Sequence, residues 1–206
     1  MKEDVLEQIV DDYLQTQGYF TRHNIKYRPH PEHPDYDAAQ DRVRSDIDVI
    51  GINPKLRGRE KVIVVSCKAY QEGFRPRYWL YLLKNNKKKG NGPAWKRLRE
   101  LWVPKWAESF RSKVEELTGD GAFTYKLAVT HLTGNQTTKE AASEWMSEPT
   151  IAENLAGSDF GFLTLEEMWK QVLSSAELTP ASSEIGRLAQ LLKASGLAPL
   201  DPPTFK

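Results

Sequence analysis

The chain has 206 residues and a formal net charge of +1, with 29 Lys and Arg against 28 Asp and Glu. Apolar residues make up 39% and charged residues 28%, a composition that excludes a disordered chain. A single cysteine, Cys67, excludes an internal disulfide framework and argues against a cysteine-based zinc site. No apolar stretch approaches the roughly 20 residues that span a bilayer, and the N-terminus lacks a signal-peptide core. We therefore expect a cytoplasmic protein with no membrane partner.

The first third of the chain predicts a helix followed by three strands. Apolar residues recur at helical spacing after residue 3, and β-branched runs follow later. We expect a helix over 3–17 and strands over 19–27, 45–52 and 61–68. The proline-rich stretch 28–42 predicts an irregular loop, and 53–60 predicts a hairpin turn because Pro54 and Gly58 interrupt it.

The remainder alternates strands and helices. Thr137 with Glu140, and Thr164 with Glu167, are capping-box signatures that open helices. We expect a strand or a helix over 77–83, a loop over 87–92 and a helix over 95–117. Strands are expected over 123–132 and 160–163, and helices over 138–147 and 164–174. A last helix is opened by Thr179–Pro180 and ended by Gly196. The order predicts one α/β (α+β) domain over 1–206, with 75–118 as a basic, Trp-rich helical insertion and 197–206 as a Pro-rich tail.

The small net charge conceals a strong segregation along the chain. Residues 75–113 hold 12 basic and 2 acidic side chains and four of the six tryptophans, whereas the flanking segments are acidic. Basic residues mixed with aromatic ones suit phosphate backbones and exposed bases. A solvated helical arm whose tryptophans pack inward explains the same pattern and stays open as the alternative.

An acidic and a basic side chain are expected on the same face of two strands that a short turn joins. Asp46 and Asp48 share one face of the strand 45–52, and Ser66 and Lys68 share one face of the strand 61–68, because side chains alternate with period two. Asp48 and Lys68 are therefore expected to lie close together, either as a structural ion pair or as a site. A carboxylate can bind Mg²⁺, and an ammonium can orient water and stabilise a charged phosphate.

The run SDIDVIG, a short turn and then VIVVSCKAYQ resembles the core of the PD-(D/E)xK nuclease superfamily, which includes Holliday-junction resolvases and many restriction endonucleases. The resemblance implies a restriction-endonuclease-like core, with a central mixed β-sheet flanked by helices. It also implies a metal-dependent DNA nuclease using Mg²⁺ or Mn²⁺, which leaves a 5′-phosphate. Many members cut as dimers, which leaves a homodimer open here.

The resemblance assigns roles residue by residue. Asp48 matches the metal-binding acid, Lys68 the catalytic lysine, and Glu7 the glutamate on the N-terminal helix, while the main-chain carbonyl of Cys67 matches a further metal ligand. Ser66 stands where the family has an acid, so it is a weak neutral ligand, for which Asp46 or Glu7 could compensate. The Cys67 thiol itself points to the opposite face and is expected in the core.

The basic stretch is expected to contact DNA. Gln71 matches a polar position that follows the lysine in some family members. The predicted DNA-binding residues are Gln71, Arg75, Arg77, Lys87, Lys88, Lys89, Lys96, Arg97 and Arg99. The serine at position 66 keeps a second hypothesis open, in which the same fold is a catalytically inactive nucleic-acid-binding or protein-interaction domain.

Overall fold

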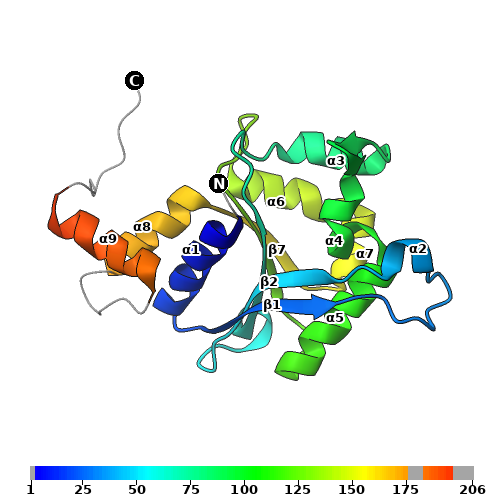
Figure 1. Ribbon diagram of the computed structural model, residues 1–206, viewed down its shortest axis with the longest axis horizontal. Helices are drawn as coiled ribbons and strands as arrows, with labels where there is room; N and C mark the ends of the chain where they lie inside the picture. The colour runs from blue at the N-terminus through cyan, green and yellow to red at the C-terminus, as the bar shows by residue number, and fades with distance from the viewer. Residues whose placement is uncertain (1–2, 176–182, 197–206) are drawn as a thin grey trace.

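The computed structural model describes residues 3–175 and 183–196, and within these ranges a five-stranded mixed sheet forms the centre (Figure 1). The strand order is β1-β2-β3-β6-β7, with β1, β2 and β3 antiparallel and β3, β6 and β7 parallel. The strands are β1 (Phe20–Tyr27), β2 (Ser45–Ile52), β3 (Val62–Lys68), β6 (Thr124–Val129) and β7 (Asp159–Thr164). The expected α/β class with a central mixed sheet flanked by helices is therefore confirmed.

Helices cover both faces of this sheet (Figure 1). On one face lie α1 (Glu3–Thr16) and α8 (Leu165–Ser175), with α9 (Glu184–Ala194) packed against them. The other face carries α3 (Pro76–Lys84), α4 (Arg99–Trp102), α5 (Pro104–Thr118), α6 (Thr138–Met146) and α7 (Pro149–Leu155). Short elements complete the order: α2 (Ala38–Asp41), η1 (Gly58–Lys61), β4 (Lys88–Lys89), β5 (Gly92–Pro93) and η2 (Ala94–Arg97). Within the described residues, no helix combines the length and the apolar character that a membrane crossing requires.

Period-two alternation along β3 separates two cores. Val62 and Val64 belong to the larger core beneath α3–α7, whereas Ile63, Val65 and Cys67 belong to the smaller core beneath α1. Cys67 is 1% exposed, so its thiol is a core group as expected. By the same alternation, Ser66 and Lys68 face the α3–α7 side.

Most elements agree with the sequence, and the differences have local causes. The capping boxes at Thr137 and Thr164 both form, and the ambiguous segment 77–83 is helical in α3. The expected helix over 95–117 is broken into η2, α4 and α5. The break between α4 and α5 arises because extended Val103 precedes Pro104 at the first position of α5. The loop 28–42 ends in the short helix α2, and helix α7 had no counterpart in the prediction. The predicted start at Thr179–Pro180 and the tail 197–206 lie outside the described residues.

The basic stretch forms part of the core layer. Trp79 and Trp106 are buried, and Trp95 and Trp102 are partly buried against the same core. The tryptophans thus pack inward, which was the alternative that the sequence left open. Most charged side chains of the stretch remain at the surface or around one pocket.

A buried carboxylate ties the loop before β2 to the start of α5. Asp41 is fully buried, accepts hydrogen bonds from the Trp106 indole at 3.0 Å and the Asp37 N–H at 2.8 Å, and pairs with the Lys105 ammonium at 2.6 Å. Burial alone would raise the pKa of Asp41, but these hydrogen bonds from Lys105 and Asp37 outweigh it and hold the pKa below its usual value.

We expect Asp41→Asn to lower the free energy of unfolding by about 3 kcal/mol at neutral pH, because it removes one partner of a buried ion pair. A lowered pKa stabilises the fold above about pH 4, and this stabilisation is lost as the pH falls through the folded-state pKa. Urea denaturation at pH 7 and in acid measures both effects. Glu116→Gln, which breaks only an exposed pair with Lys113, is the control and is expected to change stability by less than about 0.5 kcal/mol. A wild-type and Asp41→Asn difference that persists unchanged in acid would contradict this account.

Candidate functional site

The site begins where β2 separates from β3. The two strands pair from Ile52↔Val62 to Val49↔Val65, and the same register would place Asp48 opposite Ser66, but the ladder stops there. β2 continues its pairing with β1 as far as Ser45↔Tyr27, and β3 continues with β6 as far as Lys68↔Val129. The strands therefore diverge at Asp48 and Ser66 while both remain in the sheet.

The Asp48 carboxylate replaces the strand partner that β3 lacks at this point. Its Oδ2 accepts the Cys67 backbone N–H at 2.6 Å and the Ser66 hydroxyl at 3.3 Å. A buried N–H without a partner costs free energy. Asp48 is thus held in place by the backbone of the strand that carries the lysine.

The Lys68 ammonium lies over the same groups. Its Nζ donates to the Ser66 hydroxyl at 3.0 Å and to the Cys67 carbonyl at 3.1 Å, and it is 4.0 Å from Asp48 Oδ2. The Lys68 and Asp48 side chains are only 16% and 17% exposed. The predicted proximity of Asp48 and Lys68 is confirmed, and the Lys68 ammonium lies among three of the oxygen groups that the family resemblance assigned to a metal ion.

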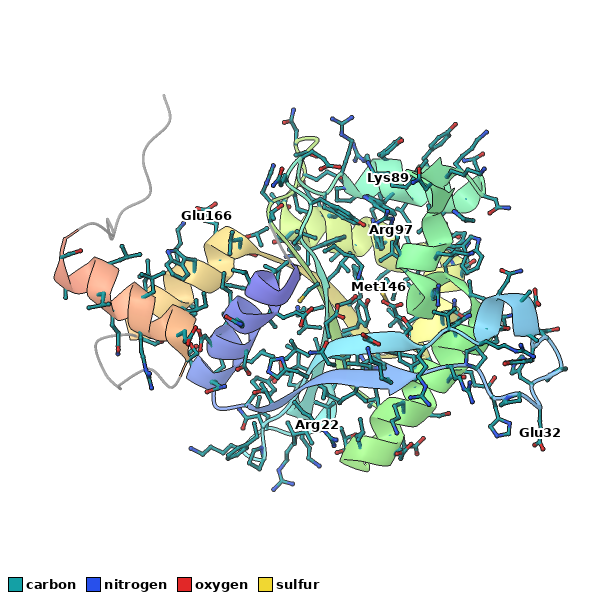
Figure 2. The ribbon with its side chains drawn as sticks, in the orientation of Figure 1. Arg22, Glu32, Lys89, Arg97, Met146 and Glu166 are labelled. Atoms are coloured by element: carbon teal, nitrogen blue, oxygen red, sulfur yellow. The ribbon has the colours of Figure 1, made fainter. Side chains whose placement is uncertain are left out.

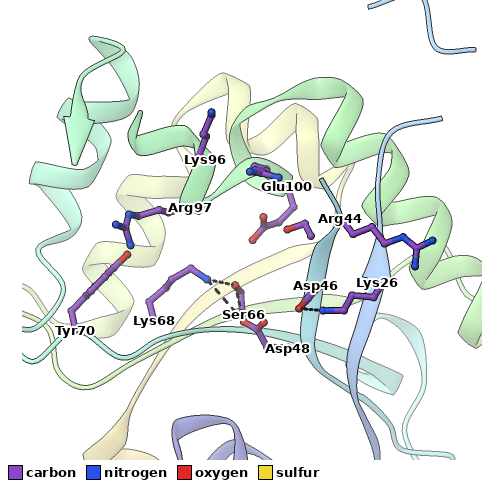
Figure 3. Close-up of a pocket in the computed structure, with 12 residues that line it drawn as sticks. Lys26, Arg44, Asp46, Asp48, Ser66, Lys68, Tyr70, Lys96, Arg97 and Glu100 are labelled. Atoms are coloured by element: carbon purple, nitrogen blue, oxygen red, sulfur yellow. Dashed lines mark hydrogen bonds and ion pairs between the residues drawn. The ribbon is translucent and has the colours of Figure 1, made fainter. Parts of the chain in front are cut away.

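These groups line a polar pocket of about 300 Å³ between β1–β3 and the basic stretch (Figure 3). Six basic and three acidic residues line it, which favours an anionic ligand. The lining residues are Lys26, Arg44, Ser45, Asp46, Asp48, Ser66, Lys68, Tyr70, Lys96, Arg97, Arg99 and Glu100.

One lining carboxylate was not predicted from the sequence. Glu100, on α4, is 7% exposed and its Oε1 accepts the Tyr125 hydroxyl at 2.6 Å. Burial, and then the negative charge of Glu100, raises the pKa of Tyr125 well above its usual value, so the phenol remains a donor. The available signal was that Glu100 is one of only two acids in the basic stretch 75–113.

Of the two remaining predicted site residues, Asp46 lines the pocket and Glu7 does not. Glu7 lies on α1, whose apolar residues pack on the face of the sheet opposite to Ser66 and Lys68, and it is not among the pocket residues. Asp46 lines the pocket, where its carboxylate forms an ion pair with Lys26. The structure thus brings together Asp48, Ser66, Lys68 and the Cys67 carbonyl, and adds Glu100.

The predicted DNA-binding residues divide into two groups. Lys96, Arg97 and Arg99 line the pocket, and the Arg99 guanidinium lies 4.6 Å from the centre of the Trp106 ring. The others lie on the surrounding surface of the α3 side, where Figure 2 shows Lys89 above Arg97. This second group consists of Gln71, Arg75, Arg77, Lys87, Lys88 and Lys89; within it Arg77 pairs with Glu144 and Lys89 with Glu72.

The oxygen ligands at the strand ends fit a hard cation bound by few protein groups. Among the residues the structure describes, no group of three or more His, Cys, Asp and Glu side chains is placed to hold a metal ion. Mg²⁺, however, usually takes one or two carboxylates and completes its shell with water and substrate phosphate. The Asp48 carboxylate, the Ser66 hydroxyl and the Cys67 carbonyl suit that mode, since all three already surround an ammonium.

Comparison with known proteins leaves the family open. No family model matches the chain, and no curated protein matches it. A solved structure titled as a protein of unknown function, AF1548, is similar over 92% of this chain and 77% of its own, with 14% sequence identity and a TM-score of 0.39.

The Tyr125–Glu100 hydrogen bond allows a test of the charge on Glu100. We expect Tyr125→Phe to lower the free energy of unfolding by about 2 kcal/mol, because the buried carboxyl group of Glu100 loses its hydrogen-bond donor. In a Glu100→Gln background the same substitution should cost about 1 kcal/mol or less, since a neutral amide oxygen accepts a weaker hydrogen bond. Urea denaturation of the four proteins of this double-mutant cycle measures the coupling. Equal costs in the two backgrounds would mean that the Tyr125 hydrogen bond is no stronger to the carboxyl group of Glu100 than to a neutral amide.

Proposed function

We propose that this protein is a divalent-metal-dependent DNA nuclease with a restriction-endonuclease-like core, acting through Asp48 and Lys68. One observation carries the proposal: a carboxylate and an ammonium meet where two sheet strands diverge, at the floor of a pocket with excess positive charge. The strand, turn and strand around them follow the sequence pattern of the PD-(D/E)xK superfamily.

Asp48, Ser66 and the Cys67 carbonyl are the groups that would hold the metal. Mg²⁺ bound there would act as a Lewis acid on a phosphate oxygen and would lower the pKa of a water ligand. Asp48 is suited to this role because the Cys67 N–H fixes its carboxylate. The Cys67 carbonyl now accepts from Lys68, so the ammonium must turn away from it when another cation is bound.

Lys68 supplies a charge at the point where a phosphodiester would react. Its side chain is mostly shielded from solvent, which would strengthen its interaction with an anion. In that position it can orient the attacking water and stabilise the charge that develops on the phosphate. Lys96 and Arg97 at the rim can hold adjacent phosphates, because both are exposed and line the same pocket.

A second function is favoured by one specific residue. Ser66 gives the motif position a neutral ligand in place of an acid, which weakens a metal site built from Asp48 alone. A protein that uses the same pocket to bind nucleic acid without cleaving it would retain the basic rim and the Lys68–Asp48 pair. Binding without cleavage is therefore the alternative that experiments must separate.

We expect the purified protein to cleave plasmid and linear DNA with Mg²⁺ or Mn²⁺. Asp48→Asn and Lys68→Met should each reduce the cleavage rate by about 100-fold or more, because each removes a charge that stabilises the transition state. Both substitutions keep the size of the side chain, and in Asp48→Asn the amide oxygen can still accept the Cys67 N–H. Agarose-gel assays of initial rates measure the effect.

Two exposed positions far from the pocket provide matched controls for this assay. Asp159→Asn at the start of β7 and Lys170→Met on α8 remove the same charges from surface pairs with Arg59 and Glu166. Both should cleave like the wild type. Equal cleavage by the wild type and the Asp48 and Lys68 variants would trace the activity to a contaminant and refute the proposal.

Binding can be measured separately from cleavage. In the presence of EDTA, we expect the double variant Lys96→Ala/Arg97→Ala to bind duplex DNA more weakly and to reduce the slope of log affinity against log salt by about 2, one for each phosphate that is no longer neutralised. Fluorescence anisotropy between low and moderate salt gives that slope. Lys170→Met is again the control, and an unchanged slope in the double variant would place the DNA elsewhere.

A further inference from the structure

We propose that Glu100 is the second carboxylate ligand of the divalent cation and takes over the role of the acid that is absent at Ser66. The inference rests on the proposed function for its choice of cation. It assigns a metal-binding role to a residue of the segment 75–118, for which the sequence predicted only contacts with DNA.

The position of Glu100 relative to the strand ends supports this assignment. It lines the same pocket as Asp48 and Ser66, and Figure 3 shows its carboxylate directed toward them. Tyr125, on the neighbouring strand β6, donates to Oε1 at 2.6 Å and fixes the direction of the carboxylate. Ligands of metal sites are commonly oriented by such outer hydrogen bonds.

The environment of Glu100 is that of a ligand without its cation. The residue is 7% exposed and lines the pocket, and within the described residues neither of its carboxylate oxygens forms an ion pair. A buried carboxylate needs a compensating positive charge. In the part of the chain that the structure describes, the adjacent Arg99 forms no ion pair with it, and its guanidinium lies 4.6 Å from the centre of the Trp106 ring.

A hard divalent ion fits this arrangement better than a structural hydrogen-bond role. Mg²⁺ and Mn²⁺ prefer carboxylate oxygens and are often held by one or two of them. Asp48 and Glu100 provide two carboxylates from opposite walls of one pocket, and Ser66 provides a neutral oxygen in the position of the missing acid.

The test is Mn²⁺ binding, followed by electron paramagnetic resonance on the full chain without DNA. We expect one site in the wild type and an affinity lowered at least about tenfold in Glu100→Gln, as in Asp48→Asn. Glu108→Gln removes the other acid of the basic stretch, whose side chain is 63% exposed, and should bind like the wild type. In thermal melts, Mn²⁺ should raise the Tm of the wild type and Glu108→Gln more than that of Glu100→Gln.

The outcomes separate this inference from the proposed function. If Asp48→Asn fails to bind Mn²⁺ while Glu100→Gln binds it like the wild type, Glu100 is not a ligand and the nuclease proposal stands. If Glu100→Gln lowers the Mn²⁺ affinity but the wild type cleaves no DNA, the metal site stands and the nuclease proposal fails. A wild type that binds no Mn²⁺ overturns the site. Should Glu100→Gln not fold in EDTA melts, Tyr125→Phe replaces it, with affinity expected to fall about tenfold and unchanged affinity as the contrary result.

Discussion

The separation of β2 from β3 at Asp48 and Ser66 is the constraint on which the site depends. A sheet that remained paired to the strand ends would leave no space there, because adjacent strands lie about 4.8 Å apart. Pairing of β2 with β1 and of β3 with β6 continues on either side, so the opening is local. The Asp48 carboxylate satisfies the Cys67 N–H in the gap, and this one contact holds the opening and aims the carboxylate. The pocket is thus a consequence of the backbone and needs no flexible lid.

The basic segment 75–118 completes the pocket, because Lys96, Arg97, Arg99 and Glu100 line it opposite the strands. Helix α4 has only four residues, too few to be stable by itself. It is held because Leu98 and Leu101 are fully buried and Asn154 of α7 donates to the Leu101 carbonyl at 3.0 Å. Arg111 of α5 donates in turn to the Asn154 carbonyl. Packing and hydrogen bonds from α5 and α7 therefore set where Arg99 and Glu100 face.

The sequence predicts those parts of the site that depend on local periodicity. Alternation along two strands was enough to bring Asp48 to Lys68 and to send the Cys67 thiol into the core. Glu100 could not be predicted in this way, because its place depends on α7, a short helix that begins at Pro149 and that the sequence pattern did not reveal. The tryptophans show the same limit: composition locates a basic, aromatic segment, but only packing decides that Trp79 and Trp106 point inward. Glu7 lies on the predicted helix, α1, and its role as a metal ligand stays a prediction.

The position of the pocket relates the basic side chains of the segment 75–118 to its buried acid, Glu100. Exposed cations on a surface favour any polyanion and give little discrimination among the phosphates of a duplex. The buried carboxylate of Glu100 among them would suit a small cation, and a metal ion bound there would add to the positive charge that attracts a phosphate. Cation and phosphate are then expected to enter the pocket in a linked manner, each lowering the cost of burying the other. Lys68 provides the positive charge beside Asp48, and its ammonium would have to leave the Cys67 carbonyl if a metal ion were bound there.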